Sequence, residues 1–433
     1  MQASFASLSL CGRLAAAAAA AAKPGGLLTA ASAALPWASQ AWQAHTAGRQ
    51  LQRQQQISSL TSLSSLHATA SAALGGDAQH FEDAAGSAVD PFALVRDEVL
   101  IVSDRLCQSI VSNVPALEQA AEYFFRPGVR GKRLRPTLLL LMSSALSEQP
   151  PPPELLLPDH RPPHERPQEQ RRRQQRIAEI AELIHVASLL HDDVLDDAET
   201  RRGISSLNAS SGNKLAILAG DFLLARASVT LASLQNTEIV ELLSRVLEHL
   251  VAGEVMQMSA GPEQLTSMAY YLDKTYYKTA SLMANSSRAV AILGEQQPEV
   301  ADLAWQYGRH LGLAFQIVDD LLDILGSSKQ LGKPALNDMR AGLATAPVLF
   351  AAEEQPGLIP LIKRKFKGDS DVQAGLQMVQ QSSGIQRAKE LAAHHAQLAA
   401  QQIEALPQSS SPHALAAREA LINITHRVLV RSK

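Results

Sequence analysis

Two short aspartate-rich runs are the residues of this sequence best suited to chemistry. The first is His191-Asp192-Asp193-Val194-Leu195-Asp196-Asp197, and the second contains Asp319, Asp320 and Asp323. In each run one aspartate precedes another by four residues, so on a helix their carboxylates would share a face one turn apart. Such carboxylates repel each other unless a cation lies between them, and Mg²⁺ binds one or two carboxylates together with water and substrate phosphate. The runs therefore predict a magnesium-dependent site for a diphosphate substrate.

The residues around both clusters are apolar, which distinguishes them from a solvated acidic helix end. Val186 to Leu190 precede the first cluster, and Phe315, Ile317 and Val318 precede the second. A solvated helix end would have lysines interleaved and polar residues upstream. If the two clusters face each other, they could hold several metal ions around one diphosphate, whose charge neither cluster alone could neutralise.

Basic residues elsewhere in the chain could bind the phosphates, since arginine offers a fork of donors and lysine a point charge. The candidates are Lys132, Arg135, Arg201, Arg202, Lys278 and Lys333. Taken singly, each is more typical of a surface cation or a helix-capping charge. His185 lies two helical turns before Asp192 on nearly the same face, and alone it would be interpreted as a core histidine.

Helical periodicity from Pro91 onward predicts an all-α fold. The decisive example is the series Ile177, Ile180, Ile184, Ala187 and His191, whose spacings of 3, 4, 3 and 4 trace one face of a helix that ends in the first cluster. The other helices are expected at about 93–111, 115–125, 132–147, 214–233, 237–259, 266–294, 298–325, 344–353, 371–404 and 413–430. With few Pro or Gly inside them, they indicate one large bundle at 90–433 rather than two domains.

Residues 150–176 interrupt this pattern, because they hold eight of the 22 prolines and end in an arginine-rich stretch. We interpret them as a surface insertion between two core helices, polyproline-like at its start. Binding of a partner by this loop is the alternative.

The first 85 residues have the composition of an organellar transit peptide. They are rich in Ala, Ser, Gln and Leu, and the first acidic residue of the 433-residue chain is Asp77. A tail without targeting function is the alternative, and composition alone does not separate mitochondrion from plastid. The rest of the chain is mildly acidic, which gives no support for nucleic-acid binding. Its one cysteine, Cys107, excludes a disulfide framework there.

The ordered motifs resemble those of the trans-isoprenyl diphosphate synthase family. They are Gly-Lys-Arg-x-Arg-Pro from Gly131, the stretch from His185 through Asp192 to Gly203, Lys278-Thr279, and Phe-Gln-x2-Asp-Asp-x2-Asp from Phe315. The resemblance runs from about residue 90 to the C-terminus, apart from the insertion. It is strongest to the plant-type solanesyl diphosphate synthases of the ubiquinone pathway, through stretches such as Lys274 to Leu282 and Leu421 to Val428.

This resemblance implies an isoprenoid synthase-type helical bundle with a central cavity, usually a homodimer, that condenses isopentenyl diphosphate with an allylic diphosphate. It also implies roles by matching position. The residues implied to bind metal are Asp192, Asp196, Asp319, Asp320 and Asp323, and Asp193 is also implied to be catalytic. The residues implied to bind the allylic diphosphate are Arg201, Lys278, Thr279, Gln316 and Lys333. Those implied to bind isopentenyl diphosphate are Lys132, Arg135, His185 and Arg202. Many bacterial relatives have Gly-Lys-x-Thr where this chain has Gly342-Leu343-Ala344-Thr345, so Lys333 is the cation expected to remain after the second cluster.

Small residues below the first cluster predict a long product. Ala187 and Ser188 lie about one turn before Asp192, where short-chain members of the family commonly have an aromatic ring. The expected activity is therefore a long-chain all-trans-polyprenyl diphosphate synthase that makes the side chain of ubiquinone or plastoquinone. The protein would act in mitochondria, or alternatively in plastids, with a peripheral membrane contact for product release.

Three other functions remain open from the sequence. A short-chain geranyl or geranylgeranyl diphosphate synthase would carry the same clusters and limit its product through deeper residues such as Ile184. A class I terpene cyclase would normally have an Asn/Ser/Glu second metal motif, which differs from the aspartates at 319–323. A regulatory subunit would typically have lost aspartates or basic residues that are present here.

Overall fold

The computed structural model describes residues 89–123, 133–156, 169–201, 203–326 and 336–431. All of them belong to one compact unit, residues 87–433. The expected leader at 1–85, the middle of the expected insertion, and Lys132, Arg202 and Lys333 lie outside the described residues.

The described chain is helical, as expected, apart from one short hairpin. Its first half contains α5 (Pro91–Leu94), α6 (Arg96–Ser109), α7 (Pro115–Glu122), α8 (Leu134–Ala145), η3 (Pro153–Leu156), α9 (Gln170–Leu195), β1 (Thr200–Arg201), β2 (Ile204–Ser205), α10 (Leu207–Ser211) and α11 (Asn213–Ala232). Its second half contains α12 (Thr237–Ser259), η5 (Gln264–Thr266), α13 (Met268–Thr275), the π-helical η6 (Tyr276–Ala280), α14 (Ser281–Leu293), α15 (Pro298–Leu325), α17 (Asn337–Arg340), α18 (Ala346–Glu354), α19 (Leu358–Lys363), α20 (Asp369–Gln380), α21 (Gly384–Glu404) and α22 (Pro412–Val430).

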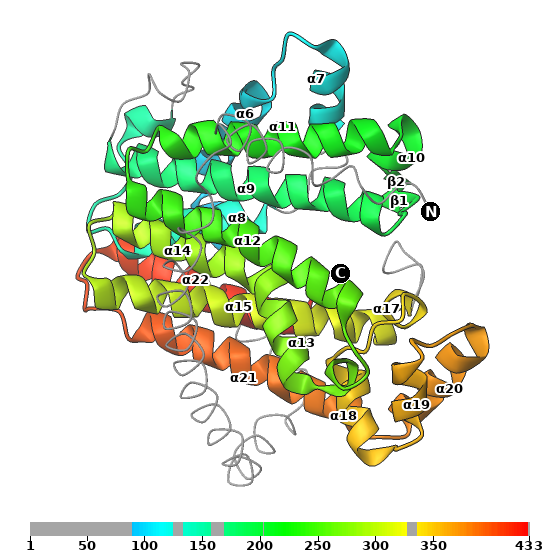
Figure 1. Ribbon diagram of the computed structural model, residues 1–433. Coiled ribbons are helices and arrows are strands. Elements are labelled where there is room, and N and C mark those ends of the chain that lie inside the picture. Colours follow the sequence, from blue (N-terminus) through cyan, green and yellow to red (C-terminus); the bar gives the residue numbers. More distant parts are fainter. Residues whose placement is uncertain (1–88, 124–132, 157–168, 202, 327–335, 432–433) are drawn as a thin grey trace, which may run out of the picture. The chain divides into compact units, whose positions relative to one another are not determined.

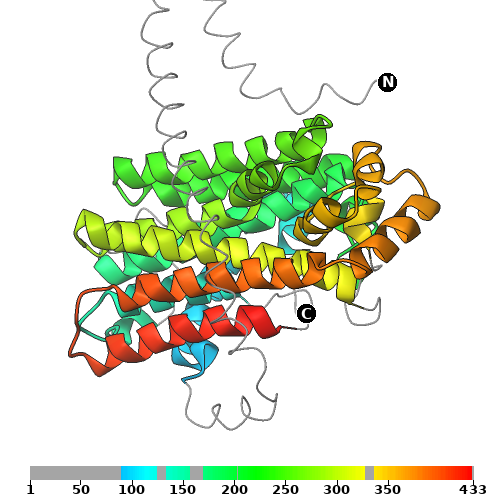
Figure 2. The same ribbon diagram turned by 90° about the horizontal axis from the view of Figure 1, so that it is seen from below.

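Two long helices, α9 and α15, form the middle of the bundle. The predicted face of α9 is buried, since Ile177, Ile180 and Ala187 are fully inaccessible. That helix packs against α8, α11 and α14, whereas α15 packs against α14, α21 and α22. Figure 1 shows α9 and α11 side by side, and Figure 2 shows α22 (red) next to α21 (orange). Helix α14 therefore joins the two halves of the core.

The close packing of α15 against α14 and η6 depends on two glycines one turn apart. A Cβ at Gly308 would lie 2.6 Å from the Met283 carbonyl oxygen, and one at Gly312 would lie 2.5 Å from the Ala280 Cα. Both neighbours are backbone atoms, which cannot move aside as a flexible side chain can. The two glycines therefore set the separation between these elements.

The structure corrects the expected bounds of two helices. The helix expected at 371–404 is two helices, α20 and α21, because the chain turns between Gln380 and Gly384. The segment expected as one helix at 266–294 begins with the short η5 and widens into the π-turn η6. π-Turns inside α-helices occur frequently at functional sites, and η6 contains Lys278 and Thr279.

The end of the expected insertion is also different, because Gln170–Arg176 form the first turns of α9. Arg176 is 1% exposed, and Arg171 pairs with the buried Glu98 of α6 at 2.5 Å. Gln175 donates a hydrogen bond to the same carboxylate at 2.7 Å. Polar side chains that would suit a surface loop are thus buried here, because Glu98 on α6 accepts hydrogen bonds from Arg171 and Gln175. The expectation of a surface loop through residue 176 was wrong for these seven residues.

Helices α17 to α20 form a separate small packing group after α15. Their core includes Met339, Leu358, Phe366 and Val372, together with Val348 of α18. Figure 1 shows these helices gathered at the end of the bundle where α15 ends. They therefore lie close to the second aspartate cluster.

Candidate active site

The two aspartate clusters lie at the C-terminal ends of α9 and α15. Figure 1 shows both helices running in the same direction, so both ends lie at the same end of the bundle. Helix α13 and η6 connect them, because Lys278 interacts with Asp192 and Tyr271 binds Asp320. Residues separated by more than one hundred positions in the chain therefore form one site.

In the first cluster, Asp192 is largely buried among other acidic groups. Burial raises its pKa from 3.8 to about 6, with contributions from Glu254 and Asp196, while Lys278 opposes the shift. The pKa of Asp196 is also raised, again mainly by burial. Lys278 forms an ion pair with Glu254 of α12. Because the carboxylates here outnumber the nearby cations, the cluster is electrostatically suited to a divalent cation.

Asp193 has a different role from its neighbours, since it is directed into the fold. It is 1% exposed, and its Oδ1 accepts hydrogen bonds from Arg201 Nε at 2.6 Å and Nη2 at 2.5 Å. Its backbone carbonyl also accepts a hydrogen bond from Asn208 at 3.0 Å. Asp193 therefore fixes the hairpin β1–β2, and with it the guanidinium of Arg201, beside the end of α9.

Asp320 of the second cluster is held at both carboxylate oxygens. Tyr271 donates a hydrogen bond to Oδ2 at 2.6 Å, and Gln316 Nε2 donates one to Oδ1 at 2.9 Å. Thr279 in turn donates to Gln316 Oε1 at 2.8 Å. Burial raises the pKa of Asp320. The predicted residues Thr279, Gln316 and Asp320 thus form one hydrogen-bonded chain from η6 to α15.

The other two aspartates of this cluster also have distinct partners. Asp319, whose side chain is 44% exposed, pairs with Arg431 at 2.6 Å, and that guanidinium lies 3.8 Å from the ring centroid of Phe315. Asp323 is buried and accepts hydrogen bonds from the backbone amides of Asn337 and Asp338 at 3.2 and 3.0 Å. Asp319 is therefore the member open to solvent, whereas Asp323 ties the start of α17 to α15.

Of the residues expected to bind the second substrate, the two that the structure describes, Arg135 and His185, lie on α8 and α9. Arg135, in the first turn of α8, lines a narrow crevice together with Leu138, Ala181, Leu282 and other residues. Arg133 pairs with Glu182 of α9 at 2.5 Å, which anchors the start of α8. His185 is half-buried on α9. The same helix carries Ala187, which is fully buried, and Ser188, whose hydroxyl donates to the His185 carbonyl at 2.9 Å.

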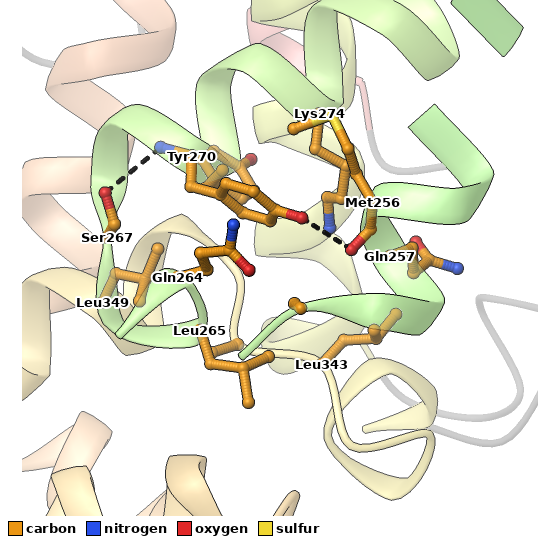
Figure 3. Close-up of a pocket in the computed structure, with 12 residues that line it drawn as sticks. Met256, Gln257, Gln264, Leu265, Ser267, Tyr270, Lys274, Leu343 and Leu349 are labelled. Carbon is orange, nitrogen blue, oxygen red and sulfur yellow. Dashed lines mark hydrogen bonds between the residues drawn. The ribbon is translucent and has the colours of Figure 1, made fainter. Parts of the chain in front are cut away.

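A second, small pocket lies between α12, α13 and the turn before α18. It is lined by Met256, Gln257, Ala260, Gln264, Leu265, Ser267, Tyr270, Tyr271, Lys274, Leu343, Ala344 and Leu349. Figure 3 shows Tyr270 across it, with its hydroxyl donating to the Met256 carbonyl at 2.9 Å. Because Tyr271 also binds Asp320, this pocket adjoins the second aspartate cluster.

The described residues fit magnesium as an ion shared with substrate. Among them, no three His, Cys, Asp or Glu side chains converge closely enough to form a complete metal cage. Mg²⁺ seldom needs such a cage, because it commonly uses one or two carboxylates plus phosphate and water. The partly exposed Asp196 and Asp319, together with the acidic surroundings of Asp192, match that mode of binding.

Four residues that contact the clusters were missed by the sequence analysis: Glu254, Tyr271, Lys274 and Arg431. Each interacts with a predicted site residue from another helix. For Glu254, no local sequence pattern was available, because the close approach of Gly253 to Lys278, where a Cβ would lie 2.7 Å from Lys278 Cγ, exists only in the folded chain. Arg431 lies at the end of the chain, and no local pattern linked it to Asp319.

Comparison with known proteins gives concordant matches. The Polyprenyl synthetase family profile matches residues 114–379. The mitochondrial solanesyl-diphosphate synthase 1 of Oryza sativa subsp. japonica is 53% identical over 344 residues, which cover 79% of each chain. The chloroplastic/mitochondrial solanesyl diphosphate synthase 3 of Arabidopsis thaliana is 50% identical over 345 residues, covering 80% of this chain and 81% of the other.

Solved structures agree with these sequence matches. The apo form of an Arabidopsis medium/long-chain length prenyl pyrophosphate synthase has a TM-score of 0.63 and 47% identity, covering 79% of this chain and 100% of that one. Heptaprenyl diphosphate synthase from Staphylococcus aureus has a TM-score of 0.68 and 27% identity, covering 78% and 99%. The resemblance inferred from the motifs is thus confirmed, and the chain belongs to the polyprenyl synthetase family.

Proposed function

We propose that this protein is a long-chain all-trans-polyprenyl diphosphate synthase that adds isopentenyl diphosphate units to an allylic diphosphate. The observation that carries this proposal is the meeting of two aspartate clusters and the Lys278 segment at one end of the bundle. The solanesyl and hexaprenyl diphosphate synthases among its relatives support the long-chain product.

The chemistry follows from the charges of the site. The C–O bond of the allylic diphosphate breaks, and diphosphate leaves with the electron pair. The double bond of isopentenyl diphosphate then attacks the allylic carbon, and the released diphosphate accepts the proton whose loss restores a double bond. We propose that Arg201 and Lys278 stabilise the negative charge that grows on the departing diphosphate, and that an apolar cavity shelters the allylic cation from water.

Mg²⁺ would be held by Asp192 and Asp196 on α9 and by Asp319 and Asp320 on α15, where it neutralises substrate diphosphate. The polyprenyl synthetase family is generally Mg²⁺-dependent. Asp323 is proposed as a further ligand on α15, and its carboxylate also accepts hydrogen bonds from two backbone amides. Lys132, Arg135, His185 and Arg202 are proposed to bind isopentenyl diphosphate; Thr279, Gln316 and Lys333 complete the proposed allylic site.

The direct test of the site uses one aspartate and a matched control. Asp192→Asn should lower kcat with isopentenyl and farnesyl diphosphates at least about a hundredfold, because it removes charge where the transition state needs metal. Asp104→Asn, at an exposed position on α6, should retain wild-type activity. Equal activities of the two variants would contradict the proposal.

The cell compartment is proposed from the leader and from the relatives. Residues 1–85 are proposed to direct the chain to mitochondria, where its product would become the ubiquinone side chain. Mitochondrial relatives support this, although one relative is named as chloroplastic/mitochondrial. A fluorescent fusion of residues 1–85 tests it, since accumulation in plastids would instead indicate a plastoquinone role.

We also propose that the enzyme is a homodimer that pairs through α11. Among the described residues, α11 is the one helix long and apolar enough to cross a membrane, and 39% of its most apolar window is buried. Leu218 and Val229, eleven residues apart on one face, are 57% and 51% exposed. A second copy of the chain would remove these side chains from water.

Sedimentation equilibrium tests this pairing. Leu218→Glu should shift the protein to monomer, whereas Leu415→Glu, at another exposed apolar position on α22, should leave the dimer intact. A monomeric wild-type protein would contradict the proposal. Because a long polyprenyl product is insoluble in water, we further propose a transient peripheral membrane contact at release, to be tested by liposome flotation with bound product.

A further inference from the structure

Lys274 is a partly buried lysine at the edge of the site that the proposed mechanism does not use. It lies in the last turn of α13, four residues before Lys278, and lines the small pocket between α12, α13 and the turn before α18. In Figure 3 its side chain extends into the group of residues around the Tyr270–Met256 hydrogen bond. Its ammonium lies 5.6 Å from the ring centroid of Tyr271, which itself binds Asp320.

The charges around Lys274 come from both halves of the site. Asp320, Asp338 and Glu254 stabilise its ammonium, whereas Lys278 opposes it. Burial is the largest influence and lowers the pKa of Lys274. Within the described part of the chain, however, no carboxylate forms an ion pair with it, although Lys278 is paired with Glu254. Lys274 is therefore a partly dehydrated cation beside a pocket, and such a cation gains strongly from an anionic ligand.

We propose that Lys274 is a further diphosphate-binding residue, which binds the allylic diphosphate from the side of the second aspartate cluster. This inference rests on the proposed function and adds to its site. The helix formed by α13 and η6 would then present two lysines about one turn apart, Lys278 toward Asp192 and Lys274 toward Asp320.

Two other residues that line the same pocket support this role. Leu343 and Ala344 line the pocket with Lys274. They belong to the turn from Gly342 to Thr345, which contains no basic residue. Among the residues that line this pocket, Lys274 is the one that carries a positive charge.

Binding of inorganic diphosphate with Mg²⁺, measured by isothermal titration calorimetry on the full chain, tests the proposal. Lys274→Gln should weaken binding about tenfold or more, because a charge-assisted hydrogen bond is lost. Lys274→Arg should retain most of the affinity. Lys389→Gln, an exposed position on α21, is the matched control and should bind as the wild type does. The KM for the allylic substrate should rise with Lys274→Gln while the KM for isopentenyl diphosphate stays unchanged.

A rescue variant separates binding from a structural role. Adding Leu343→Lys to Lys274→Gln should restore diphosphate affinity, because it returns a cation to the same pocket. If Lys274→Gln only lowers the Tm and leaves diphosphate affinity unchanged, Lys274 merely neutralises Asp320 and the proposal is overturned. Leu343→Lys alone keeps Lys274 and should tighten diphosphate binding; no tightening would also count against the proposal. Failure of the proposed function is distinct, because the wild type itself would then not elongate.

Discussion

The small side chain of Ala187 is expected to determine how far the growing polyprenyl product can extend. The residue is fully buried on α9, about one turn below Asp192. Ala187→Phe would place an aromatic ring below the allylic site, where the added volume would block the growing chain. We therefore predict products of about three or four isoprene units. Ala187→Ser, in which the side chain stays close to the size of alanine, is the control. Chromatography of labelled products checks both, and an unchanged product length for Ala187→Phe would refute the assignment.

At this scale, the sequence predicted which side chains form the site better than it predicted their individual roles. The i, i+4 spacing correctly indicated that Asp192 and Asp196 share a face. It could not separate Asp193 from Asp192, because the difference depends on Arg201, which reaches Asp193 only through the hairpin. Similarly, nothing local indicates that backbone amides from α17 occupy Asp323. Spacing within a helix determines which way a side chain points, but the residues that the side chain contacts belong to other elements.

Among the elements, η6 depends on its neighbour α15 for its position. A Cβ at Gly312 would lie 2.5 Å from Ala280 at the end of η6. Gly312→Ala should therefore displace the segment that carries Lys278 and Thr279, with a cost of about 1–3 kcal/mol in the free energy of unfolding and a fall in kcat. Gly261→Ala, where the nearest atom would be 3.7 Å away, should change neither. Chemical denaturation and steady-state kinetics give both readouts, and a fully active, stable Gly312→Ala would contradict this account.

The α15–α21 contact contains a buried histidine pair, His310 and His395, whose Nδ1 atoms lie 3.0 Å apart. Burial, aided by Arg309 and His394, lowers the pKa of His310 from 6.5 to about 3. The pKa of His395 is also lowered, chiefly by burial. Between pH 6.5 and 3 the unfolded chain therefore binds more protons than the folded one, so stability falls as the pH falls.

From this pair we predict an acid-dependent loss of stability. Between pH 6.5 and 5, His310 should cost about 2 kcal/mol of the free energy of unfolding, and His395 should act in the same direction. Replacing one of them, as in His395→Gln, should reduce the pH dependence in this range. Denaturation curves at several pH values check it. If the variant has the same pH dependence as the wild type, the pair does not cause the effect.

The ends of a helix were predictable where its apolar residues recur with clear helical periodicity. They were not predictable where tertiary contacts determine where the helix begins or ends. Helix α15 was expected at 298–325, and it lies there because Pro298 starts it and Gly326 ends it. The first turns of α9 were not expected, because their polar side chains are buried only through Glu98 of another helix. The turn that separates α20 from α21 contains no proline, so the helical pattern appeared continuous through it.

Across the whole molecule, the bundle unites residues that are distant along the chain. Asp192, Glu254, Lys278, Asp320 and Arg431 come from five elements or segments and meet at the ends of α9 and α15. The motifs were sufficient to predict an all-α synthase, because their order matches that of the family. They did not reveal which side chains would hold the clusters in place, since those contacts form only when the helices pack.

The most direct test of this account is the length of the product made by the purified chain alone. The full protein is incubated with Mg²⁺, farnesyl diphosphate and labelled isopentenyl diphosphate, and the dephosphorylated products are resolved by reversed-phase chromatography. The account predicts that products well beyond geranylgeranyl length dominate, and that chelating Mg²⁺ abolishes them. Products that stop at geranylgeranyl length, or no turnover by folded protein without an added partner subunit, would contradict it.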